Sequence, residues 1–191
     1  MNYLKWLLLA IPDLLSTPLC WILAPFVVPF ADAEGWLPKS LAWFQTPDNS
    51  LDGDKGWVNE HWQWRYRLPQ SVCTYVGRVG WLWRNPMYGY TLSVSGAELG
   101  PHDLVTVKGD IEIQDKPDGR SGWCFVTIGG YWNFYWVRQW GSSARCQRLN
   151  IGWKLKQFAE PRNSASFNRL YPVVAQYAFR YSPAKAYGVK P

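Results

Sequence analysis

Hydrophobic residues are distributed along this chain in three different patterns. Between Trp6 and Ala31 the sequence is almost continuously apolar, with Asp13 as its one charged residue. Across residues 57–68 apolar positions recur at helical spacing, and from Tyr90 onward apolar and polar residues alternate in short runs. Alternation with a period of two is typical of half-buried β-strands, whereas spacings of three and four indicate helices. The pattern therefore predicts an apolar N-terminal segment, a helical middle and a β-rich C-terminal half.

The N-terminal segment, WLLLAIPDLLSTPLCWILAPFVVPFA, is long enough to cross a bilayer if it is helical. Prolines interrupt it at positions 12, 18, 25 and 29. Each interior proline removes a backbone hydrogen bond and kinks a helix, and an aspartate near the middle adds about 2.5–3.5 kcal/mol to the cost of insertion. Several leucines offset that cost, so insertion is energetically marginal.

Three interpretations of this segment follow. In the first it is a kinked, re-entrant or interfacial membrane segment, with Trp6, Trp21 and Trp36 near its boundaries. In the second it is a secretory signal, because Lys5 precedes the apolar run and Ala31-Asp32-Ala33 resembles a cleavage site, although a proline interrupts the run early. In the third it is an apolar arm that packs on the rest of the protein or on a neighbouring subunit. We expect membrane association.

The stretch WFQTPDNSLDGD, residues 43–54, contains two turn signals and also approximates the spacing of a calcium-binding loop. The candidate ligands are Asp48, Ser50, Asp52 and Asp54. The twelfth position holds Asn59 instead of the glutamate that binds calcium through both oxygens. We therefore expect an ordered connector whose Asp and Asn side chains cap backbone amides, with these four residues as weak metal candidates only and no cofactor.

The middle region is expected to be helical. Trp57, His61, Trp64 and Leu68 fall on one helical face, and Pro69 ends the pattern. The following stretch, SVCTYVGRVGWLWRN, predicts a second helix or an extended segment, because two glycines weaken the helical signal. RNPMYGY at 84–90 predicts a turn.

Five segments of the C-terminal half are predicted to be β-strands, because aromatic and β-branched residues alternate with polar ones. They are YTLSVSG, DLVTVKGDIEIQ, GWCFVTIGG, YWNFYWVRQW and RCQRLNIGWKLKQF, with YPVVAQYAFRY as a candidate sixth. Consecutive antiparallel strands predict a meander that closes into a small barrel or sandwich. The expected fold class is α+β, with an apolar segment at 1–42, a turn-helix connector at 43–90 and an antiparallel β domain with a basic tail at 91–191.

Three motifs carry a resemblance to a known family. WFQTPDNSLDGD, WLWRNPMYGY and RLNIGWKL together resemble a family of small tailed-bacteriophage proteins known only as a domain of unknown function, over about residues 36–157. The resemblance implies a viral origin, and it brings no activity that could be transferred to these residues.

The best-defined hairpin joins residues 131–140 to residues 145–156. Its second strand separates an apolar face, formed by Leu149, Ile151, Trp153 and Leu155, from a polar face formed by Arg148, Asn150, Lys154 and Lys156. Its first strand is aromatic on both faces, so it is either covered on both sides or part of a surface on which planar ligands stack. With turns at Gly129-Gly130 and Ser142-Ser143, Cys124 lies opposite Tyr135 and Cys146 lies near Gln139, roughly 13 Å apart along the strand. That separation is too long for a disulfide.

Composition and charge add a preference for anionic partners. The chain holds 14 Trp and 11 Tyr, residues that favour cores, interfaces and membrane boundaries. Residues 1–60 carry a net charge of −4, from three basic and seven acidic residues, whereas residues 61–191 carry +10, from seventeen basic and seven acidic. Such asymmetry indicates a surface that meets phospholipid headgroups, nucleic acid or an acidic partner.

These observations lead to a hypothesis about function. No hydrolase, nucleotide-binding or metalloprotease motif is present, so we expect a non-enzymatic protein. The candidate partner-binding residues are Arg148, Lys154, Lys156, Trp132 and Trp136. We expect a membrane-associated phage accessory protein at the host inner membrane or its cytoplasmic face, with anionic lipid as a more favoured partner than nucleic acid. The alternative is a virion structural component whose apolar arm packs against neighbouring subunits.

Overall fold

The computed structural model describes residues 2–53, 63–100, 102–116, 119–140, 145–159 and 173–186. Its contacts divide the described chain into a β unit, residues 2–10 with 95–186, and a helical unit, residues 11–94. Each unit has its own hydrophobic core. The α+β class expected from the sequence is confirmed.

The apolar N-terminal run is one continuous α-helix, α1 (Tyr3–Val27), followed by the 3-10 turn η1 (Val28–Phe30). Three prolines lie inside α1, at positions 12, 18 and 25. Its first two turns belong to the β unit and the remainder to the helical unit.

The helical unit contains the 3-10 turns η2 (Lys39–Leu41) and η3 (Gln63–Arg67), and the helices α3 (Gln70–Arg84) and α4 (Tyr88–Ser93). Of the helix predicted over residues 57–68, the part up to residue 62 lies outside the described residues. SVCTYVGRVGWLWRN is helical despite its glycines, because Gly77 lets the guanidinium of Arg65 pack against the helix. A Cβ at Gly77 would lie 1.7 Å from Nη1 of Arg65.

The strand predicted over YTLSVSG is wrong, since its first four residues lie in α4 and β1 begins only after it, at Ala97. Met87 takes up a left-handed conformation (φ 50°) after Pro86 and turns the chain, and α4 starts at Tyr88. The hydroxyls of Thr91 and Ser93 then donate to backbone carbonyls one turn earlier. The turn at Met87 therefore determined the structure of this stretch, although its side-chain types alternate as in a strand.

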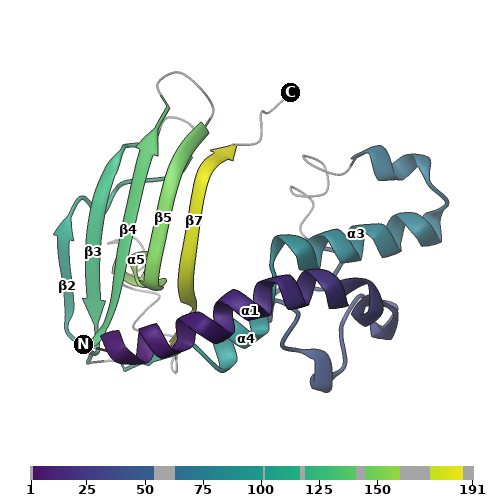
Figure 1. The fold of residues 1–191 in the computed structure, drawn as a ribbon, viewed down its shortest axis with the longest axis horizontal. Helices are drawn as coiled ribbons and strands as arrows, with labels where there is room; N and C mark the ends of the chain where they lie inside the picture. Colours follow the sequence, from purple (N-terminus) through teal and green to yellow (C-terminus); the bar gives the residue numbers. More distant parts are fainter. Residues whose placement is uncertain are drawn as a thin grey trace. The chain divides into compact units, whose positions relative to one another are not determined.

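The β unit is built on an open five-stranded antiparallel sheet with the strand order β2-β3-β4-β5-β7 (Figure 1). The strands are β2 (Val105–Gly109), β3 (Gly122–Ile128), β4 (Tyr131–Gln139), β5 (Arg145–Trp153) and β7 (Tyr177–Ala186). A small second sheet pairs β1 (Ala97–Leu99) with β6 (Val173–Ala175), and the short helix α5 (Lys156–Ala159) follows β5. The meander was predicted correctly, but β2 and β7 remain at opposite edges of the sheet, so no barrel closes.

The register of the central strands agrees with the prediction from the turns. Cys124 lies opposite Tyr135 and Cys146 lies opposite Gln139, so the two thiols are far apart along β4. The four cysteines are buried free thiols.

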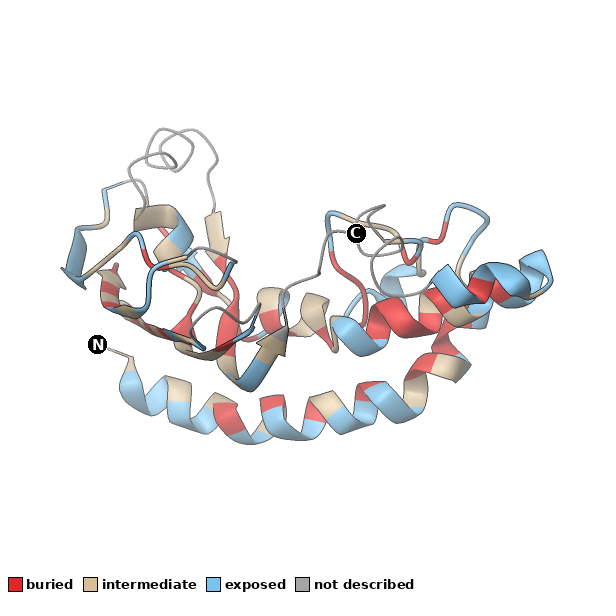
Figure 2. Ribbon diagram, turned by 90° about the horizontal axis from the view of Figure 1, so that it is seen from above, coloured by how far each residue is buried: buried red, intermediate tan, exposed pale blue. Residues whose placement is uncertain are grey.

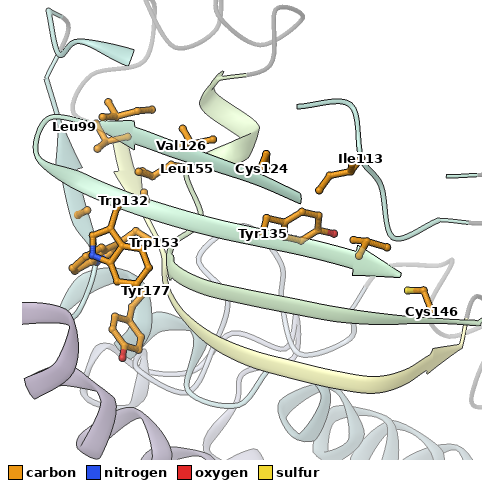
Figure 3. Packing of buried hydrophobic residues seen from close by; sticks show 14 residues of the cluster. Leu99, Ile113, Cys124, Val126, Trp132, Tyr135, Cys146, Trp153, Leu155 and Tyr177 are labelled. Carbon is orange, nitrogen blue, oxygen red and sulfur yellow. The ribbon is translucent and has the colours of Figure 1, made fainter. Parts of the chain in front are cut away.

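Both faces of the sheet are packed, by different partners (Figure 3). Cys124, Val126 and Tyr135 point to one face, where Leu99, Ile113 and Leu155 cover them. Trp132, Trp153 and Tyr177 point to the opposite face, towards α1. Leu155 was expected to share a face with Trp153. It lies on the other side because β5 ends at Trp153 and the chain turns into α5.

Candidate functional site

One side of α1 presents large apolar side chains to solvent along the whole helix. Figure 2 shows these exposed positions alternating with buried ones. We call this side the outer arc, and its members are Leu4, Leu7, Leu8, Ile11, Leu14, Leu15, Leu19, Ile22 and Phe26. Their spacing of three and four residues places them within one stripe of the helix, and the stripe contains no charged residue.

The opposite side of α1 carries the smaller and more polar residues. Asp13 is fully buried and Ser16 nearly so, together with Ala10, Cys20 and Ala24. A helix on the surface of a water-soluble protein has the reverse arrangement, with polar residues towards water and large apolar residues towards the core. The polarity of α1 is thus inverted.

The first two turns of α1 are held on the sheet by Trp6. Its ring lies 5.3 Å from the ring of Trp132 and 5.4 Å from that of Phe179, measured between centroids. Its indole Nε1 donates to the carbonyl of Ala178 at 3.2 Å, and the hydroxyl of Tyr177 donates to the carbonyl of Trp6 at 3.1 Å. Trp132, predicted as a partner-binding residue, is only 6% exposed in this cluster.

The later turns of α1 are held by side chains that replace hydrogen bonds lost to proline. An α-helix needs a donor from residue i to the carbonyl of residue i−4, and proline has none. The carbonyl of Trp21, which Pro25 cannot serve, accepts a hydrogen bond from Nε1 of Trp83 at 2.9 Å. The carbonyl of Pro25, which Pro29 cannot serve, accepts one from the hydroxyl of Tyr75 at 2.9 Å. Two residues of α3 therefore compensate for two prolines, Pro25 of α1 and Pro29 of η1.

The loop at residues 43–53 is tied into the helical unit. The side chain of Asp52 pairs with the guanidinium of Arg78, with Oδ1 2.8 Å from Nε. Arg78 also donates to the carbonyls of Asp32 and Ala33, and the hydrogen bond with Asp52 raises the pKa of Arg78. Asp52 was expected to cap backbone amides, and it instead binds a side chain 26 residues away.

The remaining calcium candidates do not gather into a site within the described residues. Asp48 is exposed and forms no hydrogen bond to the described chain, while Asp54 lies outside it. The backbone turn is held by Gln45 and Thr46, whose side chains both donate to the carbonyl of Asn49. No group of three His, Cys, Asp or Glu side chains spaced for a metal ion occurs in this part of the chain or elsewhere among the described residues.

The three predicted basic residues of the β unit do come together. Arg148, Lys154 and Lys156 line one pocket of about 340 Å³, which we call the basic pocket. Its other lining residues are Asp115, Asn133, Tyr135, Asn150 and Gln157. The strand β5 contributes two of these residues, the turn after it contributes Lys154, and the helix α5 contributes Lys156 and Gln157.

Asp115 is the one carboxylate among the lining residues of this pocket. It lies 2.7 Å from Nη1 of Arg148 and also pairs with Lys185. Burial alone would raise the pKa of Asp115, but the hydrogen bonds and charges of Lys185 and Arg148 outweigh it and lower that pKa. Burial, followed by the charge of Asp115, raises the pKa of Tyr135, so this phenol stays protonated. No sequence signal marks Asp115, because its partners are 33 and 70 residues away.

Trp136, the other predicted aromatic candidate, lies outside the basic pocket. It is partly exposed and stands directly opposite Trp123 on β3 and Leu149 on β5. Side chains alternate between the two faces along a strand, so Trp136, four residues after Trp132 on β4, belongs to the same face as Trp132. The structure therefore separates the predicted partner-binding residues into a basic group and an aromatic group on opposite faces.

Comparison with known proteins identifies a family without a described activity. The model of the family of unknown function DUF7338 matches residues 1–188. No curated protein and no solved structure matches the chain significantly.

Proposed function

Because the chain belongs to the DUF7338 family of unknown function, we propose a function from its own geometry: it is a non-enzymatic, membrane-associated protein whose helix α1 lies in the membrane–water interface. The single observation that supports this most strongly is the inverted polarity of α1, with Asp13 fully buried and Ile11 65% exposed.

Length and apolar composition alone are weaker support. The segment Tyr3–Phe30 is long and apolar enough to cross a membrane, but core helices and signal sequences meet the same criterion. A core helix would be mostly buried, whereas 28% of the most apolar window of this segment is buried. Soluble monomers rarely expose contiguous apolar patches larger than a few hundred Å². Each fully buried Leu, Ile or Phe side chain contributes about 1.5–3 kcal/mol, so nine such residues give lipid a large driving force.

We propose an in-plane position and not a transmembrane one. The inner side of residues 3–10 packs on strand residues of the β unit, and that of residues 11–27 packs on α3. α3 carries Arg78 and Arg84 and the polar residues Gln70 and Thr74. A spanning α1 would carry such groups into hydrocarbon, where unpaired charges and polar groups are costly. With α1 at the interface, the outer arc enters lipid while the protein stays on the aqueous side.

The biological setting extends the same proposal. The resemblance to tailed-phage proteins supports a phage accessory role at the host inner membrane or its cytoplasmic face. The basic residues Arg148, Lys154 and Lys156 of the β unit would then engage the partner. The alternative is a virion component, in which the outer arc packs on a neighbouring subunit.

Flotation of the full-length protein with phosphatidylcholine vesicles tests the membrane role. We expect the wild type to float with the vesicles. Leu15→Asp combined with Ile22→Asp, both 65% exposed, should weaken binding at least about tenfold, because Asp is strongly disfavoured in apolar surroundings. Leu104→Asp is the matched control, since Leu104 is 78% exposed in the β unit and its change should leave flotation unaltered.

Two outcomes would contradict the proposal. A wild type that remains free of vesicles, or a double variant that floats as well as the wild type, would exclude lipid binding through the outer arc. A vesicle-free wild type that forms a stable oligomer, which the double variant dissociates, would favour the virion alternative. Stoichiometric recovery of the protein from purified particles by mass spectrometry would support that alternative independently.

A further inference from the structure

Binding to a membrane through α1 leaves one apolar surface of the β unit unexplained. The strand register places Trp123, Trp136, Leu149 and Tyr181 side by side in a row across β3, β4, β5 and β7. Trp123 is 48% exposed and Tyr181 is 60% exposed, and the two residues between them are partly exposed. We call these four residues the aromatic row.

The aromatic row lies on the face of the sheet that also carries the first two turns of α1. Trp136 follows Trp132 by four residues on β4, and Trp132 contacts Trp6. Tyr181 follows Phe179 by two residues on β7, and Phe179 also contacts Trp6. The first turns of α1 therefore cover one end of this face, and the aromatic row is open to the same side of the β unit.

The side chains on this face change in a regular order with distance from α1. Along β4 the order is Phe134, then Trp136, then the exposed residue Arg138. On β7 an apolar ring, Phe179, is likewise followed by an amphipathic ring, Tyr181. A membrane surface changes in the same order, because Trp and Tyr are enriched between the hydrocarbon and the aqueous phase and Arg and Lys lie beyond them. Neighbouring rows are roughly 7 Å apart, close to the thickness of about 5–8 Å of one headgroup layer.

The charges on this face suit an anionic lipid surface. None of the five strands of the sheet contains an acidic residue. Lys108 on β2 lies opposite Phe125 on this face, and its side chain is exposed, as is that of Arg138. The two acidic residues shortly after β2 pair with Arg120. An anionic surface would thus meet cations and amphipathic rings on these strands and no carboxylate.

We propose that the aromatic row is a second membrane contact, which lies at the headgroup boundary of an anionic bilayer while Lys108 and Arg138 meet lipid phosphates. This inference rests on the proposed in-plane position of α1, because Leu4, Leu7 and Leu8 of the same unit then enter lipid on this side. An in-plane helix sinks about 5–10 Å into the membrane surface, and its diameter is about 10–12 Å. The sheet face behind α1 therefore stays at the level of the headgroups.

Flotation of the full-length protein with phosphatidylcholine vesicles that contain phosphatidylglycerol tests the aromatic row. Trp123→Ala combined with Tyr181→Ala should weaken binding about fivefold or more, because both rings are lost from the boundary region that favours them. Val105→Ser combined with Val107→Ser is the matched control. These valines are 37% and 39% exposed on the opposite face of the sheet, so their change should leave binding unaltered.

Arg138→Gln tests the charge separately, and it keeps the inference testable if the aromatic variant folds poorly. Arg138 is exposed near the end of β4, so its change should not disturb folding. The variant should reduce the preference for phosphatidylglycerol over pure phosphatidylcholine vesicles about fivefold. Lys156→Gln removes the same charge beside Tyr135, which points to the opposite face from Trp132 (Figure 3), and it should keep the preference.

The outcomes distinguish this inference from the proposed function. Suppose that the wild type floats and the variant Leu15→Asp with Ile22→Asp does not, while the aromatic variant and Arg138→Gln bind as the wild type does. The aromatic row is then no membrane contact, although the proposed function stands. A wild type that stays free of vesicles would exclude both. Loss of the phosphatidylglycerol preference in Lys156→Gln but not in Arg138→Gln would assign the anionic lipid to the opposite face and overturn our inference.

Discussion

The tryptophans Trp21 and Trp83 exchange hydrogen bonds between α1 and α3. Nε1 of Trp83 donates to the carbonyl of Trp21 at 2.9 Å, and Nε1 of Trp21 donates to the carbonyl of Trp83 at 3.3 Å. The carbonyl of Trp21 lacks its helical donor because residue 25 is proline, and that of Trp83 lies in the last turn of α3. Both are carbonyls that their own helices leave unpaired, so the pair joins the two helices at the positions where each lacks a donor.

Trp83→Phe should lower the free energy of unfolding by about 1 kcal/mol, since it keeps an aromatic ring and removes one donor. In a Pro25→Ala background the alanine N–H can serve the carbonyl of Trp21, so the cost of Trp83→Phe should fall by about half or more. Urea denaturation of the four proteins measures this coupling. Equal costs in both backgrounds would show that the proline and the indole act independently.

Arg78 should matter more to the helical unit than its partner Asp52. Arg78→Ala removes hydrogen bonds to a carboxylate and to two backbone carbonyls, so we expect a loss of about 1.5–3 kcal/mol. Asp52→Asn should cost about 1 kcal/mol, because Asp52 is half exposed and Arg78 keeps its backbone acceptors. Thermal denaturation orders the two variants. A larger loss for Asp52→Asn would contradict this assignment.

Calcium should not raise the melting temperature, because the carboxylate of Asp52 is committed to Arg78. Asp48→Ala should change stability by less than about 0.5 kcal/mol, as expected for an exposed residue away from such contacts. A calcium-dependent rise in melting temperature that Asp48→Ala abolishes would restore the calcium-loop interpretation.

The ion pairs of Asp115 should give the β unit a stability that is lost in acid. Its pKa is lowered from 3.8 in the folded chain, so the folded state favours the carboxylate. The stabilisation is complete above the ordinary pKa and disappears as the pH falls through the folded pKa. Asp115→Asn should therefore cost about 1–3 kcal/mol at neutral pH, and its difference from the wild type should shrink below pH 3.8. A difference that stays constant from neutral pH into this acid range would show that the charge of Asp115 is not involved.

Salt should distinguish binding through the outer arc from binding through basic residues. The outer arc of α1 holds no charged residue, so flotation on phosphatidylcholine should be nearly the same at low and at physiological ionic strength. Binding of an anionic partner through basic residues would instead weaken as salt rises, because ions screen partly exposed charges. Flotation series at the two salt concentrations measure the difference. Membrane binding that falls steeply with salt would point to basic residues and away from the outer arc.

Several parts of the fold followed from local pattern. The strands β3, β4 and β5 were predicted because aromatic and β-branched residues alternate there between clear turn signals. Their register followed too, since Gly129-Gly130 sets the pairing of Cys124 with Tyr135. Where a turn changed the chain direction, as at Met87 and after Trp153, the same alternation led to wrong assignments.

The helical state of α1 was harder to predict, because its prolines argue against a regular helix when only the segment itself is considered. The missing hydrogen bonds are supplied by Trp83 and Tyr75, more than 45 residues further along the chain. Local rules describe what a segment lacks, and they do not describe what a distant side chain can supply.

Clustering of Arg148, Lys154 and Lys156 was foreseen from strand alternation, whereas Asp115 in their midst was not. Alternation constrains residues close in sequence, so the apolar run, the strand pattern and the basic face could be recognised without coordinates. Packing determines which charges meet and which side of a helix is covered. The pairing of Asp115 with Arg148 and the inverted polarity of α1 therefore became visible only in the folded chain, because both depend on contacts between residues far apart in sequence.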